Sequence, residues 1–406
     1  MSSASATTRP RPPDFLVFSD DWGEHPSSCQ HIFRQIALEH RVLWVNTIGM
    51  RNPTFTLRDA RKIMRKVAKM AGARSVPAAA RTADGYVTVC QPLMLPGIRS
   101  TLVRALNARS VTLAVRTRLQ SLGIDDPIVL STVPNAADYP DLLAGRQVIY
   151  YCVDDFSLWP GLDAALVLEM ESRLIARADS LIAVSHTLRE RLAASGKPTH
   201  LLTHGVDVKL FSTPAAREHS VLTDIPRPRA GFFGLIDGRM DWELIVSLAQ
   251  RMPDTSFVLA GPVDASAGNL PQIENLHVVG PMRYTELPQL IAGLDLLILP
   301  YRTGALAAAL SPLKLNEYLA TGKPVISAPI AAASEWADTL MIARTPAEWA
   351  MFARHALGSQ DQRGRQIPVR LVAQSWASKA QELLSLCGRE DCADDCATEL
   401  SRSVAP

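Results

Sequence analysis

The chain has 406 residues, of which 47% are hydrophobic and 20% charged, with 42 basic side chains against 40 acidic ones. This length suffices for two or three domains with their own cores, and the composition excludes an intrinsically disordered chain and a generic polycationic nucleic-acid binder. The sequence has no run of about 18 apolar residues, so it predicts no membrane-spanning helix. Residues 1–13 lack an apolar segment and are expected to be a disordered leader, which predicts a cytoplasmic protein.

The charge is distributed unevenly along the chain. Between Arg51 and Gln120 there are fourteen basic residues against two acidic ones, a local net charge of +12. Six of the basic residues are spaced three and four apart and would share one helix face: Arg58, Arg61, Lys62, Arg65, Lys66 and Lys69. This pattern fits docking on an anionic membrane surface or a merely solvated helix. Nucleic acid is disfavoured because no recognition motif or interleaved aromatic residue accompanies the charge.

The first half of the chain alternates short apolar runs with longer segments of helical periodicity. We expect strands at residues 15–18, 42–46, 87–90, 128–131, 148–153 and 180–184, and helices at 31–39, 99–122 and 162–178. Strands alternating with crossover helices predict a parallel α/β sheet.

The same alternation starts again after residue 229. Strands are expected at 230–233, 256–260, 276–279, 294–299 and 324–327, and helices at 242–251, 287–292 and 312–321. The predicted fold is therefore α/β, with two Rossmann-like, doubly wound parallel-sheet domains facing each other across a cleft. Their expected bounds are 14–205 and 229–372, joined by a linker at 206–228 that is rich in charge and proline.

The end of the chain is predicted to be a helix at 373–387 and a disordered acidic tail at 388–406. Cys387, Cys392 and Cys396 lie there without the C-x2-C spacing of structural zinc sites, so we expect no metal.

The helix expected at 312–321 has unusually clear boundaries. Ser311 suits the N-cap, Pro312 the first helical position and Gly322 the left-handed residue after the helix. Lys314 then lies in the first turn, where the helix dipole disfavours a cation, so an anion should compensate it. Two interpretations remain open. Lys314 and Glu317 could form a local ion pair on a solvated face, or residues Ser311, Leu313 and Lys314 could bind a diphosphate while Glu317 accepts hydrogen bonds from a ribose.

Two further strand ends carry candidate ligand groups. Gly234, after the strand at 230–233, would let backbone approach a ligand, and Arg239 could make a bidentate phosphate contact. The alternative for Arg239 is an ion pair with Asp237 or Asp241. Like Gly234, Gly280 directly follows an expected strand, at 276–279, where it would let backbone approach a ligand.

Two adjacent carboxylates, Asp154 and Asp155, follow the strand expected at 148–153, where a polar catalytic group of an α/β domain belongs. Adjacent strand residues point to opposite faces, so one of the pair would face the cleft. The alternative is that Asp155 caps the next helix. The first strand is not followed by G-x-G-x-x-G, which argues against a nicotinamide dehydrogenase.

Glu317 stands just before Ala320-Thr321-Gly322-Lys323-Pro324-Val325. At these residues the chain resembles the GT-B glycosyltransferases, particularly the retaining family 4 (group 1), across about residues 14–385. The family's signature has a second Glu eight positions earlier, where this chain has Ala309. The Ser311 to Lys314 segment is similar to that of a divergent branch involved in bacterial surface polysaccharides.

The resemblance implies a retaining glycosyltransferase without cofactor or metal. It would move a sugar from a nucleoside-diphosphate sugar to a glycan or lipid-linked acceptor in cell-surface polysaccharide biosynthesis. It would be a cytoplasmic protein that binds peripherally to the inner face of the plasma membrane. Arg239 and Lys314 would stabilise the leaving diphosphate, Asp154 or Asp155 would touch the sugar or acceptor, and the Gly280 loop would hold the base. Two alternatives remain: a non-catalytic nucleotide-binding subunit of glycan assembly, motivated by Ala309, and a sugar-nucleotide epimerase of the same fold.

Overall fold

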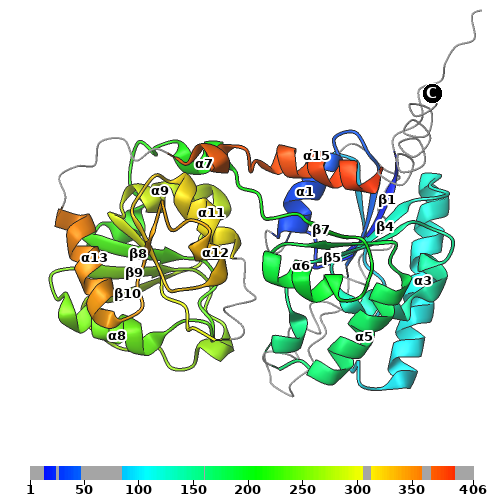
Figure 1. The fold of residues 1–406 in the computed structure, drawn as a ribbon, viewed down its shortest axis with the longest axis horizontal. Helices are drawn as coiled ribbons and strands as arrows, with labels where there is room; N and C mark the ends of the chain where they lie inside the picture. The colour runs from blue at the N-terminus through cyan, green and yellow to red at the C-terminus, as the bar shows by residue number, and fades with distance from the viewer. Residues whose placement is uncertain are drawn as a thin grey trace, which may run out of the picture. The chain divides into compact units, whose positions relative to one another are not determined.

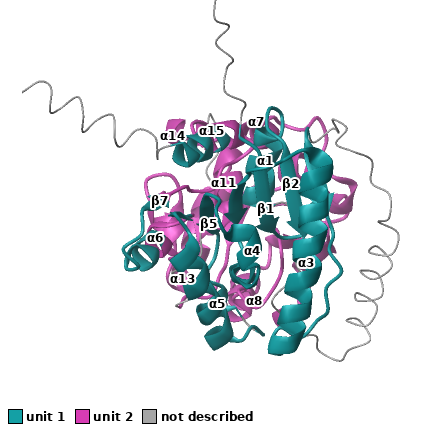
Figure 2. Ribbon diagram, turned by 90° about the vertical axis from the view of Figure 1, so that its right-hand side faces the viewer, with its two compact units in different colours: residues 1–183, 189–200, 380–406 teal, residues 184–188, 201–379 magenta. Residues whose placement is uncertain are grey.

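The computed structural model describes residues 13–23, 27–46, 85–159, 161–304, 312–358 and 367–388. These residues fall into two compact units (Figures 1 and 2), the first within residues 1–183, 189–200 and 380–406 and the second within 184–188 and 201–379. Each unit is built on one sheet with helices on both faces (Figure 1).

The first sheet has seven strands in the order β3-β2-β1-β4-β5-β6-β7. Their bounds are β1 Phe15–Ser19, β2 Val42–Asn46, β3 Val87–Cys90, β4 Ile128–Ser131, β5 Val148–Cys152, β6 Ser180–Ala183 and β7 Thr199–Leu201. From β3 to β6 all neighbouring strands pair in parallel. Every residue of β1, β2 and β5 is buried, because helices cover both faces of the sheet.

The helices of the first half include the three predicted ones, now with exact bounds: α1 Ser28–Ile36, α3 Thr101–Leu122 and α5 Ala164–Arg177. Shorter elements are η1 Pro134–Asp138, α4 Pro140–Leu143, η2 Phe156–Leu158 and α6 His186–Ala193. Ser27, Ser100 and Asp163 accept backbone hydrogen bonds as the N-caps of the three long helices.

The second sheet has six parallel strands in the order β10-β9-β8-β11-β12-β13. Their bounds are β8 Arg229–Phe233, β9 Ser256–Ala260, β10 Leu276–Gly280, β11 Leu296–Leu299, β12 Val325–Ser327 and β13 Met341–Ile342. The strand order reverses between β8 and β11, and ligands of open α/β sheets bind beyond the carboxyl ends of the strands at such a point. The predicted α/β fold class is confirmed.

The second half contains both short and long helices. The bounds are α7 Val208–Ser212, η3 Ser220–Leu222, α8 Trp242–Arg251, η4 Ala265–Ala267, η5 Tyr284–Glu286, α9 Leu287–Ala292, α11 Leu313–Ala320, α12 Ala331–Ser334, α13 Pro346–Gly358, α14 Val369–Val372 and α15 Trp376–Cys387. Residues 206–228, expected to be a linker, are grouped with the second unit, and α15 begins in that unit and ends in the first.

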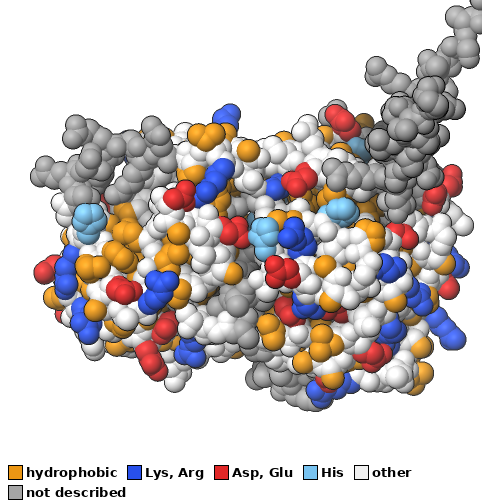
Figure 3. Space-filling view, viewed as in Figure 1, with side chains coloured by type: hydrophobic (Ala, Val, Ile, Leu, Met, Phe, Trp, Pro, Cys, Tyr) orange, Lys and Arg blue, Asp and Glu red, His pale blue; other side chains and the backbone are white. Residues whose placement is uncertain are grey.

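Two strands were not predicted, because both are too short to form a recognisable apolar run. The three residues of β7 are half-buried, and β13 has only two residues, also half-buried. On the face drawn in Figure 3, basic and acidic side chains lie interspersed over the described surface. The described helices include none that is long and apolar enough to cross a membrane.

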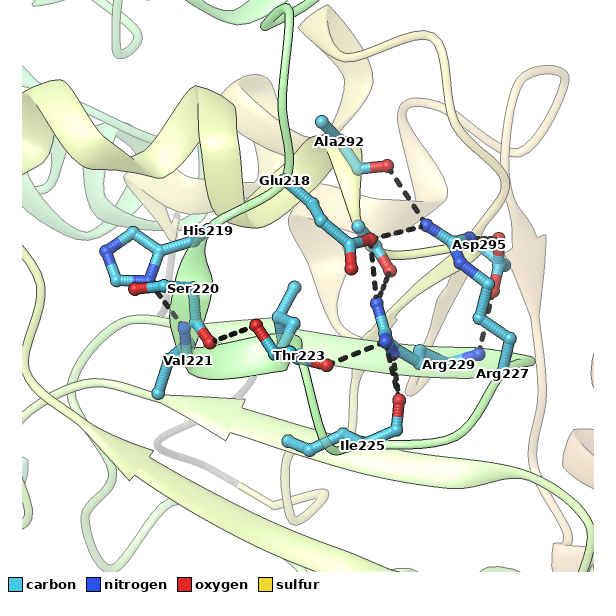
Figure 4. A network of polar contacts seen from close by, with 12 residues as sticks. Glu218, His219, Ser220, Val221, Thr223, Ile225, Arg227, Arg229, Ala292 and Asp295 are labelled. Atoms are coloured by element: carbon cyan, nitrogen blue, oxygen red, sulfur yellow. Dashed lines mark hydrogen bonds and ion pairs between the residues drawn. The ribbon is translucent and has the colours of Figure 1, made fainter.

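A buried arginine fastens the segment before β8 to the second sheet (Figure 4). The Arg229 side chain is 5% exposed and donates to the carbonyl oxygens of Leu222, Ile225 and Gly293 and to the Glu218 carboxylate at 3.0 Å. Its backbone N–H donates to Asp295. Because the buried guanidinium has carbonyl and carboxylate partners, it orders residues 218–228 against the start of β8.

We predict that Arg229→Met lowers the free energy of unfolding of the second unit by about 3 kcal/mol, since it leaves several carbonyl groups without a donor. The matched control is Arg227→Met. Arg227 contacts Glu218 and Asp295 as well, but its side chain is 46% exposed, so the loss should stay below about 1 kcal/mol. Urea unfolding followed by tryptophan fluorescence measures both, and equal losses would contradict this account.

Candidate functional site

Three neighbouring strands of the second sheet end in glycine at the same edge. The N–H of Gly234, after β8, donates to the carbonyl of Ala260 at 2.9 Å, and the N–H of Gly261, after β9, donates to that of Gly280 at 2.7 Å. Gly234 has a φ of 134°, and a Cβ there would lie 2.3 Å from Lys314 Nζ. A Cβ on Gly261 would lie 1.8 Å from the Gly234 carbonyl oxygen. Both positions therefore require glycine, and the edge is lined by backbone.

Lys314 crosses from α11 to the end of β8. Its Nζ lies 4.3 Å from the centroid of the Phe232 ring and 5.4 Å from that of Tyr301. Within the described residues this buried Nζ has no hydrogen-bond partner, and neither has the buried hydroxyl of Tyr301. The aromatic faces stabilise the ammonium group only in part. A desolvated cation with unused donors is suited to binding an anion.

Arg239 approaches the same ring from the β8–α8 turn. Its guanidinium carbon lies 5.4 Å from the Tyr301 centroid. Its Nε donates to Asp237 at 2.9 Å, and an Nη lies 2.6 Å from the same carboxylate. Asp241 instead caps α8. The ion-pair alternative for Arg239 is thus realised with Asp237, and this contact holds the guanidinium near the Tyr301 ring that Lys314 also approaches.

Glu317 lies one turn after Lys314 and is 5% exposed. Burial raises the pKa of its carboxyl from 4.5 to about 7, while the Tyr284 hydroxyl and the charge of Lys314 act in the opposite direction. The alternative in which Lys314 and Glu317 lie on a solvated helix face is therefore wrong, because Lys314 Nζ and the Glu317 carboxyl are both buried.

The helix that carries these residues starts one position later than predicted. Pro312 has an extended ψ of 119° and forms the N-cap, so Leu313, not Pro312, is the first helical residue. Lys314 stays in the first turn, and Gly322 has the expected left-handed φ of 67°. Ser311 and Ala309 lie outside the described residues.

The aspartates of the first unit are fixed at the end of β5. Asp154 accepts from the N–H of Asp155 at 2.9 Å, and Asp155 accepts from the N–H of Ser157 at 3.1 Å as the N-cap of η2. The capping alternative for Asp155 is therefore what the structure contains. A catalytic role for either aspartate stays a prediction.

Sequence reasoning missed the group that supports this loop. Glu171 of α5 is 5% exposed, accepts from Tyr150 at 2.7 Å and pairs with Arg191 of α6 at 2.6 Å. Arg191 also lies 3.7 Å from Asp155. A glutamate in line with the buried Val167, Met170 and Leu174 was the available signal, because an acid on an apolar helix face needs a partner.

The remaining predicted residues are placed as follows. The basic face at Arg58 to Lys69, and Cys392 and Cys396 of the tail, lie outside the described residues. Cys387 is buried at the end of α15. Among the described side chains, no group of three His, Cys, Asp or Glu is placed to hold a metal ion.

Comparisons with known proteins bear on this second-sheet edge. A family model described as Glycosyl transferases group 1 matches residues 240–358, which include α8, α11 and most of the strands around them. Solved structures with both sheets are also similar. Anabaena HepE in complex with UDP-glucose has a TM-score of 0.58 and 17% identity, and the match covers 97% of this chain and 100% of HepE. Sucrose-phosphate synthase from Thermosynechococcus elongatus has a TM-score of 0.58 and 13% identity, covering 96% of this chain and 98% of that one. The trehalose-6-phosphate synthase OtsA has a TM-score of 0.62 and 11% identity, covering 93% of this chain and 99% of that one.

Residues 240–358 thus match the glycosyl transferases group 1 model, and the chain has the GT-B fold. The resemblance found in the sequence is thereby confirmed. A curated relative, the putative teichuronic acid biosynthesis glycosyltransferase TuaH of Bacillus subtilis (strain 168), is 31% identical over 225 residues, 50% of this chain. The match spans 56% of that relative's length. These findings support the prediction of a glycosyltransferase.

The raised pKa of Glu317 predicts a pH dependence of stability. The carboxyl binds its proton more tightly in the folded state, so its contribution is fully present below about pH 4.5 and is lost as the pH rises through about 7. Across that window the second unit should lose about 3 kcal/mol on account of this group. Glu317→Gln should remove this part of the pH dependence, as urea unfolding at pH 5 and pH 8 would measure.

The control is Glu243→Gln, an exposed glutamate in the first turn of α8. It should leave the pH dependence as in the unaltered protein. If Glu317→Gln also left it unaltered, the Glu317 carboxyl would not titrate as described.

Proposed function

We propose that the protein is a retaining glycosyltransferase that moves a sugar from a nucleoside-diphosphate sugar to a glycan or lipid-linked acceptor in cell-surface polysaccharide biosynthesis. The observation that carries this proposal is that Lys314 and Arg239 both approach the Tyr301 ring at the switch point of the second sheet, with the Lys314 side chain also reaching Gly234. The group 1 family match at residues 240–358 covers Lys314 and Tyr301 and begins directly after Arg239. The similarity to TuaH, named for teichuronic acid biosynthesis, supports the polysaccharide context.

The two cations suit the diphosphate of the donor. Lys314 Nζ has unused donors. The Arg239 guanidinium, which Asp237 holds in place, has the planar donor geometry that suits a phosphate. Gly234 lets the diphosphate approach the backbone after β8. As the bond from the sugar to the diphosphate breaks, negative charge grows on the leaving phosphate, and both cations stabilise it.

Glu317 is proposed to accept hydrogen bonds from the ribose hydroxyls, and the loop at Gly280 is proposed to hold the base. Burial raises the pKa of the Glu317 carboxyl to about 7, and hydrogen bonds donated by the ribose hydroxyls would favour its ionised form. HepE has been solved with UDP and with UDP-glucose, which makes uridine nucleotides the first donors to test.

Other features of the proposal rest on the resemblance. The transfer would retain the configuration of the sugar and need no metal, and Asp154 or Asp155 would contact the sugar or acceptor. The protein would bind the inner face of the plasma membrane through the basic residues from Arg58 to Lys69. Transfer that continues in EDTA would support the metal-free mechanism.

The experiment is thermal stabilisation by UDP, GDP, ADP and their sugars, since a ligand that binds the folded state raises the melting temperature. One nucleotide should stabilise the protein, and Lys314→Met should weaken its binding about 10- to 100-fold because charge-assisted hydrogen bonds are lost. Glu317→Ala should weaken it too. Lys209→Met, at an exposed lysine of α7, is the matched control and should bind as the unaltered protein does.

Turnover separates the proposal from its alternatives. Arg239→Ala and Lys314→Ala should both reduce sugar transfer, and unchanged turnover in both would refute the mechanism. Ala309, where the family has Glu, favours a subunit that binds nucleotide without transfer. Binding without turnover with any acceptor would establish that alternative, and a changed sugar nucleotide in the absence of acceptor would establish an epimerase.

A further inference from the structure

Tyr301 carries a buried hydroxyl group for which the described part of the chain supplies no hydrogen-bond partner. The side chain is 1% exposed and stands two residues after β11, the strand that pairs with β8 at the switch point. Burying a hydroxyl without a partner costs free energy. A phenylalanine, with the same ring and no hydroxyl, would therefore suit the fold at least as well, and the hydroxyl calls for another explanation.

The backbone fixes Tyr301 against the turn that carries Arg239. Tyr301 and Met240 form an antiparallel bridge, and the N–H of Arg302 donates to the carbonyl of Arg239 at 2.8 Å. The N–H of Tyr301 itself donates to the carbonyl of Leu299 at 3.0 Å. The ring therefore has a defined place beside Arg239 in the free protein.

Two cations approach the ring of Tyr301. Lys314 Nζ and the guanidinium carbon of Arg239 each lie 5.4 Å from its centroid. Asp237 balances the charge of Arg239, whereas Lys314 Nζ has no acceptor within the ranges that the structure describes. The charge of Lys314 favours an anion at this place, and an anion is also a strong acceptor for the neighbouring hydroxyl.

Tyr318 of α11 is a tyrosine of the same unit whose hydroxyl the fold does use. It is fully buried, and its hydroxyl accepts from the N–H of Phe233 at 2.9 Å and lies 3.2 Å from the carbonyl oxygen of that residue. Burial raises the pKa of Tyr318, and the neighbouring Tyr301 raises it further. The two phenols thus lie near the end of β8, and the backbone of Phe233 satisfies that of Tyr318.

We propose that the Tyr301 hydroxyl donates a hydrogen bond to a phosphate oxygen of the nucleoside-diphosphate donor. It joins Lys314 and Arg239 as a third group that binds the diphosphate, and it adds a directed donor without adding charge. A hydrogen bond to a charged oxygen is stronger than one to a neutral acceptor, so the hydroxyl contributes to affinity. This inference rests on the proposed function, because it assigns a contact within the same donor site.

The first test is urea unfolding in the absence of nucleotide. Tyr301→Phe keeps the ring and should leave the unfolding midpoint unchanged or raise it, because the free protein loses no hydrogen bond. Tyr318→Phe is the matched control and should lower the midpoint, because the Phe233 backbone loses its partner. A midpoint that Tyr301→Phe lowers as far as Tyr318→Phe does would show a structural hydroxyl and overturn the proposal.

The second test is isothermal titration of the full chain with a nucleoside, its diphosphate and the corresponding nucleotide sugar, beginning with uridine, UDP and UDP-glucose. Tyr301→Phe should weaken the binding of the diphosphate about ten-fold and leave that of the nucleoside unchanged, since one charge-assisted hydrogen bond is lost. Tyr139→Phe, at a buried tyrosine of the first unit, is the control and should bind the diphosphate as the unaltered protein does.

Three outcomes of the titration would overturn the proposal and leave the proposed function standing. Equal binding of the diphosphate by Tyr301→Phe and the unaltered protein would show that the hydroxyl does not contact it. A loss confined to the nucleotide sugar would place the hydroxyl at the sugar. An equal loss for nucleoside and diphosphate would show a general change of the site.

A fourth outcome concerns the unaltered protein. If it binds no nucleoside diphosphate with any of the three bases, uracil, guanine or adenine, the proposed function fails and the contact of Tyr301 fails with it.

Discussion

A buried ammonium group sets the main physical requirement on the second unit. Lys314 Nζ is withdrawn from water, touches the aromatic rings of Phe232 and Tyr301, and has no hydrogen-bond partner among the described residues. Desolvating a cation is expensive, and two rings return only part of the lost hydration energy. Such a group is maintained in a fold when a bound anion completes its surroundings, which is why we regard this place as the functional centre of the unit.

Several local features follow from that requirement. Gly234 has a φ of 134°, which residues with a side chain rarely adopt, and it lies against the Lys314 side chain. Gly261 must lack a side chain because the Gly234 carbonyl oxygen stands where its Cβ would be. Asp237 holds the Arg239 guanidinium beside the same aromatic ring. Glu317, one turn along α11, is pushed toward its neutral form by burial. The site therefore holds the Lys314 cation, the Arg239–Asp237 ion pair and one carboxyl of adjustable charge.

The sequence predicted most of this because periodicity and punctuation are local signals. Eleven strands were recognisable as apolar runs, and the glycines at the ends of β8 and β10 marked the ligand edge. What it could not predict depends on contacts across the fold. Tyr301 follows β11 and joins Lys314 and Arg239 only through the pairing of β8 with β11, and the Glu171 to Arg191 pair depends on how α5 and α6 meet. The start of α11 was misplaced by one residue because Pro312 fits both the N-cap and the first helical position.

The most direct test of the account compares a nucleoside with its diphosphate by isothermal titration, using the base that stabilises the protein, in the unaltered chain and in Lys314→Met. If Lys314 and Arg239 bind the diphosphate, the diphosphate should bind the unaltered protein at least ten-fold more tightly than the nucleoside, and Lys314→Met should remove most of that difference while leaving nucleoside binding unchanged. A variant that weakens both ligands equally, or neither, would contradict the assignment of the buried ammonium group to the diphosphate.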